Sequence, residues 1–202
     1  MTIQQIQEAL FILQNGGLVA YPTDTVYGLG ADAFNAAAVR KIYAAKDRAA
    51  HLPLPLLVAD LEMLRDTAAE LSDLALSLAT RFMPGPLTII VPKAPSVPDT
   101  VTAGGPNVAL RIPAHPVPRA LAAGLAGPLV GTSANRSGEG SATTAREVHR
   151  ELGDAVDVII EGECTGGVES TVLDLTQGKP IVVRAGAIPL EELEEALGTA
   201  VV

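Results

Sequence analysis

The chain has 202 residues, enough for one large domain with its own core, and we expect a single domain over 1–202. Its formal net charge of −9 and its 3% of aromatic residues, with no tryptophan, argue against nucleic-acid binding through bulk positive charge or base stacking. No apolar run approaches the ~18–20 residues of a membrane span, and no signal-peptide pattern opens the chain. The one cysteine, Cys164, can form no internal disulfide. Together these features predict a cytoplasmic protein free of membranes.

The first half of the chain alternates helical and strand patterns. Apolar residues at helical spacing predict a helix over 2–15, with Thr2 and Gln5 at capping-box positions and Gly16-Gly17 ending it. The elements predicted after it are a strand over 18–22, a helix over 35–45, a strand over 54–59, helices over 60–67 and 72–82, a strand over 87–91 and a Pro/Gly-rich loop over 93–106.

The second half continues the alternation. Helices are predicted over 116–125, 143–152 and 189–197, and strands over 108–112, 128–132, 156–160, 171–175 and 181–184. The turn at Gln177-Gly178 implies an antiparallel pair. Alternating strands and helices predict an α/β fold with a mixed sheet.

The stretch Y-P-T-D-T-V-Y-G-L-G, residues 21–30, follows a buried apolar run. Its hydroxyls can orient a polar molecule, its glycines allow backbone to approach it, and loops after sheet strands are the usual ligand position in open α/β folds. The alternative is a structural turn in which Asp24 is a local cap.

Two further segments fit an anionic ligand. Lys46 and Arg48 lie just past a predicted helix and could hold a polyphosphate, although cations at a helix C-terminus are also favoured by the helix dipole. G-T-S-A-N-R-S-G, residues 131–138, follows a strand and is typical of a backbone anion nest with Ser133 and Asn135 adding hydrogen bonds. It is neither a P-loop nor a nucleophile elbow.

Two arginines abut aliphatic strand residues. Arg111 and Arg184 therefore need an anionic partner, either an internal carboxylate such as Asp174 or a ligand. The histidines at 51, 115 and 149 lack metal-ligand spacing, so no dedicated metal site is predicted.

Taken in order, these segments resemble the YrdC/Sua5/TsaC family of threonylcarbamoyl-AMP synthases. The resemblance covers about 5–190 and rests on Y-P-T-D-T-V-Y-G-L-G, K-D-R with P-L five residues after its Arg, P-G-P-L-T at 84–88, R-I-P at 111–113, G-T-S-A-N-R-S-G, E-S-T-V-L-D at 169–174 and V-R-A-G at 183–186. It implies a twisted open mixed sheet with flanking helices around a large concave cavity, in a short form without the extra C-terminal Sua5 domain.

The resemblance also implies a reaction. L-threonine, bicarbonate and ATP, the last with Mg²⁺, would give threonylcarbamoyl-AMP and pyrophosphate, and partner transferases would move the threonylcarbamoyl group to tRNA in threonylcarbamoyladenosine (t6A) synthesis. The same resemblance places Thr25, Tyr27, Arg111 and Ser170 on threonine. It places the nucleotide on Lys46, Arg48, Asn107, Ser133, Asn135, Thr143 and Arg184, of which Lys46, Arg48 and Arg184 would be catalytic.

The sequence departs from the family pattern at three positions. Ala49 stands where the family usually has Pro, and Leu52 and Leu57 stand where many members have Asn and His. The alternatives are a carbamoyl-adenylate former acting on another acceptor and a non-catalytic double-stranded RNA- or tRNA-binding module with weak RNA contact.

Overall fold

The strands form two hydrogen-bonded sheets in the computed structural model, which describes residues 2–198. The four-stranded sheet has the order β7 (Thr132–Ser133), β2 (Gly28–Gly30), β1 (Val19–Tyr21), β8 (Val158–Ile159). The six-stranded sheet has the order β10 (Ile181–Arg184), β9 (Thr171–Asp174), β4 (Leu87–Pro92), β5 (Asn107–Arg111), β3 (Leu56–Leu57), β6 (Leu129–Val130). Both contain parallel and antiparallel pairs, which confirms the predicted mixed α/β class.

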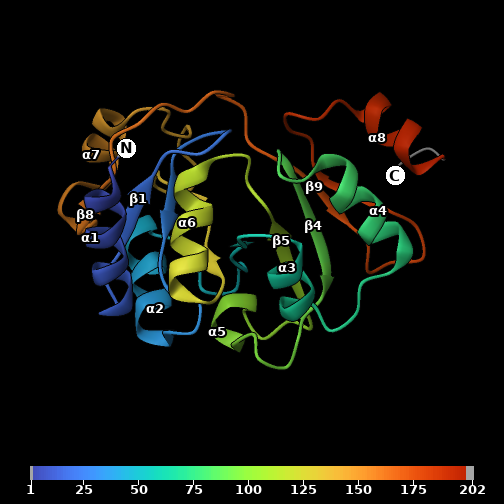
Figure 1. The fold of residues 1–202 in the computed structure, drawn as a ribbon, viewed down its shortest axis with the longest axis horizontal. Coiled ribbons are helices and arrows are strands. Elements are labelled where there is room, and N and C mark those ends of the chain that lie inside the picture. Colours follow the sequence, from blue (N-terminus) through green and yellow to red (C-terminus); the bar gives the residue numbers. More distant parts are fainter. Residues whose placement is uncertain (1, 199–202) are drawn as a thin grey trace.

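The helices flank these sheets at both ends of the molecule. They are α1 (Ile3–Gln14), α2 (Ala36–Lys46), α3 (Leu61–Thr67), α4 (Asp73–Phe82), α5 (Asp99–Thr102), α6 (Pro116–Leu125), α7 (Ala145–Leu152) and α8 (Leu190–Leu197), with a 3₁₀ turn over Gly153–Ala155. In Figure 1, α1, α2 and α7 lie with β1 and β8 in one half, α4 and α8 lie with β4 and β9 in the other, and α6 lies between them.

Local sequence signals fix the ends of several helices. The predicted capping box of α1 is present, since Thr2 accepts from the Gln5 N–H and the Gln5 side chain accepts from the Thr2 N–H. Helix α2 begins after Asn35, whose side chain caps it, and ends at Lys46, followed by the C-cap residue Asp47, which is left-handed with φ of 50°. This stop places Lys46 in the last turn and Arg48 just beyond it.

The sequence interpretation missed some short elements and overextended others. Residues 28–30, interpreted as part of a ligand loop, pair with β1 as strand β2. The predicted strand 54–59 is reduced to β3, which lies between β5 and β6 and begins directly after Pro55. The loop over 93–106 contains the short helix α5. Because these elements are only two to four residues long, their periodicity is too short to predict them.

Close backbone approach explains two glycines of the first motif. A Cβ on Gly28 would lie 2.5 Å from the Tyr21 ring, and one on Gly30 would lie 2.7 Å from it. The Tyr21 hydroxyl donates to the Val130 carbonyl, so this ring fastens the β1–β2 hairpin to β6. The chain then passes through Gly131 from β6 of the larger sheet into β7 of the smaller one.

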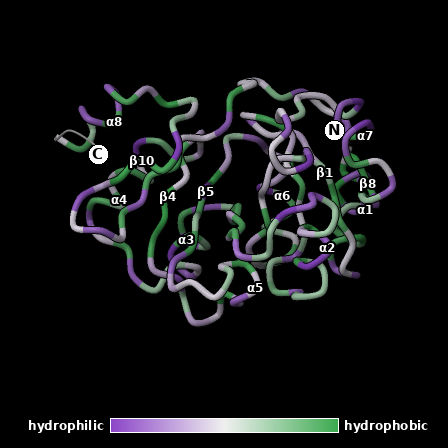
Figure 2. The backbone as a smooth tube through the Cα atoms, turned by 180° about the vertical axis from the view of Figure 1, so that it is seen from behind, coloured by the Kyte–Doolittle hydropathy of each residue, from purple (hydrophilic) through white to green (hydrophobic). Residues whose placement is uncertain are grey.

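The core is aliphatic, as predicted from the composition. Buried Leu, Ile, Val and Ala residues dominate two clusters, and Figure 2 shows hydrophobic residues along β4 and β5. No helix within residues 2–198 combines the length and the apolar character that crossing a bilayer requires. Met1 and residues 199–202, which the single-domain prediction includes, lie outside the described residues.

Candidate functional site: a cation-lined cavity between the two sheets

A cavity of about 840 Å³ is lined by residues of both sheets. It brings together segments that are far apart in the sequence, including 23–28 of the first motif, 131–139, 105–111 and 169–172. Ten of the eleven predicted site residues line it: Thr25, Tyr27, Lys46, Arg48, Asn107, Arg111, Ser133, Asn135, Ser170 and Arg184. Thr143 is not among the lining residues, and its hydroxyl and N–H both donate to Glu147 at the start of α7.

Lys46 is a buried cation to which no carboxylate among the described residues is bonded. The residue is 2% exposed, and its ammonium donates to the backbone carbonyls of Ser133 and Asn135, the second at 2.5 Å. Burial, aided by the positive charge of Arg48, lowers the pKa of Lys46 to about 8. Two of its three N–H groups are used by these carbonyls, which leaves one for an anionic ligand.

Arg48 is held in a comparable way. Its guanidinium donates to the carbonyls of Leu52 and Pro53, at 3.4 and 2.9 Å. Burial also lowers the pKa of Arg48. Since backbone carbonyls carry no net charge, these hydrogen bonds leave Lys46 and Arg48 uncompensated at this end of the cavity. The charge of Glu169 acts on Lys46 from nearby, but that carboxylate is paired with Arg184.

The segment after β7 closes around this end. The Ser137 N–H donates to the Lys46 carbonyl at 2.9 Å, which docks the segment on the last turn of α2. The Asn135 amide donates to the carbonyls of Arg136 and Glu139, at 3.0 and 2.7 Å. Its Oδ1 is buried and has no hydrogen-bond partner among the described residues. A buried acceptor of this kind is costly unless a ligand donates to it.

Arg111 lies at the other end, with a carboxylate as its partner. Its Nη2 lies 2.6 Å from Asp24 Oδ1, its Nη1 donates to the Thr25 hydroxyl at 3.0 Å and its Nε to the Gly85 carbonyl at 2.9 Å. The side chains of Arg111 and Asp24 are only 7% and 10% exposed. Of the two partners foreseen, the internal carboxylate is present, but it is Asp24 rather than Asp174. Asp174 instead accepts from Thr176.

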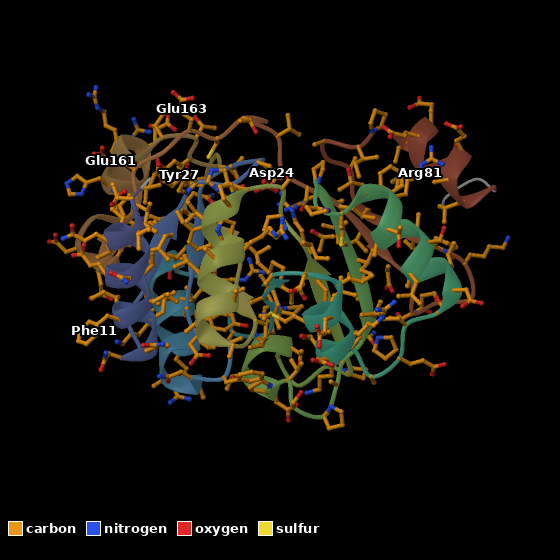
Figure 3. All side chains as sticks on the ribbon, in the orientation of Figure 1. Phe11, Asp24, Tyr27, Arg81, Glu161 and Glu163 are labelled. Atoms are coloured by element: carbon orange, nitrogen blue, oxygen red, sulfur yellow. The ribbon has the colours of Figure 1, made fainter. Side chains whose placement is uncertain are left out.

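This ion pair makes Asp24 more than a local cap. Figure 3 shows Asp24 between the two halves of the molecule, above α6. Burial lowers the pKa of Arg111, the Asp24 carboxylate opposes that effect, and Arg184 adds to it. The hydroxyls beside the pair are ordered, because Thr23 donates to the Val26 carbonyl at 2.6 Å and so accepts from Thr25 at 2.9 Å.

Arg184 is the last residue of β10, and Ser170 immediately precedes the neighbouring strand β9 of the larger sheet. The guanidinium donates to the Ser170 carbonyl from Nε and Nη2, to the Ser170 hydroxyl at 3.1 Å, and to the Glu169 carboxylate. Ser170 also bonds the Thr88 hydroxyl at 2.8 Å. Sequence reasoning did not select Thr88, Glu169 or Asp24, although each lies inside a motif that it quoted.

Tyr27 and Asn107 line the cavity with their polar atoms bonded to the protein. The Tyr27 hydroxyl lies 3.1 Å from the Ile160 carbonyl and 3.0 Å from that of Gly162, and burial raises its pKa to about 12. Figure 3 places Tyr27 near the segment that carries Glu161 and Glu163. The Asn107 amide donates to Thr176 at 3.3 Å. Leu57, where the family pattern often has His, packs against Gly131, whose added Cβ would lie 2.3 Å from it.

Carboxylates are sparse in the cavity. Within the part of the chain that the structure describes, no three His, Cys, Asp or Glu side chains group as a metal site. The carboxylates that line the cavity are Glu139 and Glu169, and Glu169 is occupied by Arg184. These residues fit a metal ion that arrives with phosphate ligands better than one held by the protein alone.

A known family matches most of this chain. The family model Sua5_yciO_yrdC, described as "Telomere recombination", matches residues 11–186. The chain belongs to this Sua5/YciO/YrdC family. The match includes every predicted site residue and both sheets.

Curated relatives of the family are similar over almost the whole chain. The threonylcarbamoyl-AMP synthase of Pyrococcus abyssi is 44% identical over 195 residues, which are 96% of this chain and 57% of the relative. The threonylcarbamoyl-AMP synthase of Bacillus subtilis is 42% identical over 196 residues, again 96% of this chain and 57% of the relative. The chain thus spans a little over half the length of these two relatives.

A solved structure of the family matches the fold closely. The crystal structure of P. abyssi Sua5 complexed with L-threonine superposes with a TM-score of 0.94 at 43% identity, covering 97% of this chain and 58% of the other. That complex shows a Sua5/YciO/YrdC member binding an amino acid.

Proposed function

We propose that this chain is an L-threonylcarbamoyladenylate synthase, a nucleotidyltransferase that joins L-threonine, bicarbonate and ATP. The observation that carries the proposal is one cavity with two chemically different ends. Lys46 and Arg48 supply uncompensated positive charge at one end, and Arg111 with ordered threonine hydroxyls lies at the other. The cavity volume of about 840 Å³ is in the range of small-molecule sites and suits a nucleotide beside an amino acid.

The names of the relatives support the same reaction. Both curated relatives are threonylcarbamoyl-AMP synthases, and the P. abyssi structure was solved with L-threonine. By analogy, threonine lies at the Arg111 end, where the arginine and the Thr25 and Ser170 hydroxyls receive its carboxylate and side chain. The triphosphate lies against Lys46, Arg48 and the segment of Ser133 and Asn135, with Arg184 between the two substrates.

The reaction forms and breaks defined bonds. The threonine amine and bicarbonate first give a carbamate with loss of water. A carbamate oxygen then attacks the α-phosphorus of ATP, and the bond from that phosphorus to the β-phosphate oxygen breaks. Pyrophosphate leaves with the electron pair, and threonylcarbamoyl-AMP remains.

Negative charge grows on the phosphates during this displacement, so fixed cations lower the barrier. Lys46, Arg48 and Arg184 are preorganised donors whose carbonyl and carboxylate partners hold them in the cavity wall. Mg²⁺, which ATP would bring and its phosphate oxygens would hold, supplies further charge neutralisation. Positioning of the carbamate against the α-phosphate provides the rest of the catalysis.

The product implies partners. An acyl-adenylate such as threonylcarbamoyl-AMP is an activated donor, and t6A-pathway transferases that act on tRNA would consume it. The proposed setting is the cytoplasm.

Threonine-dependent release of pyrophosphate tests the proposal. Purified protein is incubated with ATP, Mg²⁺, bicarbonate and threonine, and then with each component omitted. Pyrophosphate that forms only with all components present, together with threonylcarbamoyl-AMP by mass spectrometry, is the expected result. Turnover with another acceptor in place of threonine would favour a different carbamoyl-adenylate former. Tight binding of RNA without turnover would favour the RNA-binding module.

A further inference from the structure

Glu169 is a carboxylate of the cavity wall to which neither the sequence motifs nor the proposed reaction gives a role. It is 31% exposed in its side chain and forms an ion pair with Arg184, which is 43% exposed. Its second oxygen accepts from the Ser141 hydroxyl at 2.6 Å. Ser141 belongs to the segment that follows β7 of the smaller sheet, while Arg184 lies on β10 of the larger sheet. One carboxylate therefore joins the two sides of the cavity.

Glu169 is also held through its backbone. The Ala187 N–H donates to the Glu169 carbonyl at 2.9 Å. A Cβ on Gly186 would lie 2.4 Å from that carbonyl oxygen and 2.5 Å from the Ser170 backbone, so the chain that follows Arg184 packs directly on residues 169–171. This close packing sets the distance between Glu169 and the guanidinium.

The carboxylate also determines where Arg184 points. The guanidinium Nε and Nη2 are directed at Ser170, and Glu169 holds the remaining nitrogen, Nη1. Because the planar guanidinium is bonded to Ser170 on one side and to Glu169 on the other, few other rotamers of Arg184 keep both partners. Without the carboxylate, Arg184 would be repelled by Arg111, whose pKa its charge already lowers, and would be free to turn towards solvent.

We propose that Glu169 is a positioning residue, which aims Arg184 and the Ser141 segment at the nucleotide phosphates from opposite sides of the cavity. The inference rests on the proposed function. Glu169 does not itself need to touch the nucleotide. Because it adds a negative charge near Lys46, it also weakens the attraction of the free cavity for a polyphosphate.

Kinetics of Glu169→Gln give the sharpest test. Misplacement of a charge-stabilising group by about 1 Å can cost about 100-fold in rate, so we expect kcat to fall about 10- to 100-fold. Removal of the negative charge favours ATP binding, so the KM for ATP should stay within about threefold of wild type or decrease. Glu169→Asp keeps the charge but cannot span both partners, and we expect it to recover only part of kcat.

A control between β8 and β9, the part of the chain that also carries Glu169, separates the effect of losing a negative charge from the effect of misplacing Arg184. Glu163 is exposed and does not line the cavity, so Glu163→Gln makes the same charge change and should leave kcat unchanged. If Glu169→Gln binds ATP more weakly and its melting temperature falls by a matching amount, the residue has only a structural role, which would overturn the proposal. A kcat within threefold of wild type would do the same.

A second readout does not depend on catalysis. The Arg184 Nε–Hε signal in a ¹⁵N NMR spectrum is assigned by its disappearance in Arg184→Lys, and its exchange with water is measured. We expect exchange to be about tenfold faster in Glu169→Gln, because a guanidinium that has lost its charge-assisted bond at Nη1 turns more easily and its bond from Nε to the Ser170 carbonyl opens more often. Unchanged exchange in Glu169→Gln refutes the positioning role. Absence of pyrophosphate release by the wild-type protein refutes the proposed function instead, and the exchange measurement does not depend on it.

Discussion

The two ends of the cavity neutralise their cations in opposite ways. At one end, the Arg111 guanidinium meets the buried Asp24 carboxylate at 2.6 Å. At the other, Lys46 and Arg48 donate only to backbone carbonyls in the hydrogen bonds that the structure gives them. The first arrangement is electrically complete, while the second carries a net positive charge.

This difference indicates what each end can do. A compensated arginine keeps its geometry whether or not a ligand is present, so it can serve as a fixed donor for a small zwitterion such as threonine. Uncompensated, partly desolvated cations gain most when an anion arrives, which suits a polyphosphate. The cations are therefore distributed according to the charge that each end is expected to receive.

Breaking the compensated pair should produce the largest effect. Asp24→Asn leaves the Arg111 charge buried and unpaired, so we expect the free energy of unfolding to fall by about 3–5 kcal/mol. Urea denaturation of the variant and wild type measures this. The matched control is Lys46→Met. Removing the buried charge stabilises the fold and losing two hydrogen bonds destabilises it, so the free energy of unfolding should stay within about 1 kcal/mol of wild type. Equal losses in both variants would remove the distinction between the ends.

Removing a cation that is proposed to face the phosphates should affect catalysis rather than folding. Arg48→Ala or Arg184→Ala should cost about 2–4 kcal/mol of transition-state stabilisation, by analogy with loss of one preorganised donor. Steady-state assays of threonine-dependent pyrophosphate release measure the effect, and circular dichroism checks the fold. Activity within about threefold of wild type would contradict the assignment for that residue.

The pH dependence of nucleotide binding should reveal Lys46. Its pKa of about 8 in the free protein means that it is protonated below that pH and loses its charge above it. ATP binding requires the charge, so affinity should be flat below pH 8 and fall by up to tenfold per pH unit above it. The free protein itself should gain stability as pH rises from 8 towards 10.5, because the unfolded chain binds this proton more tightly.

Titration calorimetry at several pH values measures this affinity, and buffers of different ionisation enthalpy report proton uptake. Lys46→Arg keeps a charge at every pH tested and should remove the dependence. The same slope in Lys46→Arg would assign the titration to another group.

Tyr27→Phe should produce the smallest effect. The hydroxyl bonds the backbone of residues 160–162, so its loss should cost about 1 kcal/mol of stability and leave the KM for threonine within about threefold. Thr25→Val, which removes a hydroxyl bonded to Arg111, is the comparison and should raise that KM more. A tenfold rise in Tyr27→Phe would show that the tyrosine hydroxyl turns to the substrate.

Much of the fold follows from local sequence patterns. The capping box at Thr2, the Asn35 cap and the alternation of longer elements predict the long helices and most of the strands correctly. The strands β2, β3 and β7 are missed or misplaced because two or three residues carry too little periodicity, and their pairing is decided by distant partners. The domain range and the individual ligand roles stay predictions.

The sequence by itself determined which chemical groups are available: hydroxyls after a strand, cations at the end of a helix, and arginines next to aliphatic strand residues. Only the tertiary structure decided which charge meets which. Asp24 and Arg111 are 87 positions apart, Lys46 and Ser133 likewise, and Thr143 is drawn to Glu147 instead of the cavity. Local patterns depend on neighbours along the chain, whereas compensation of a buried charge depends on which segments the sheets bring into contact.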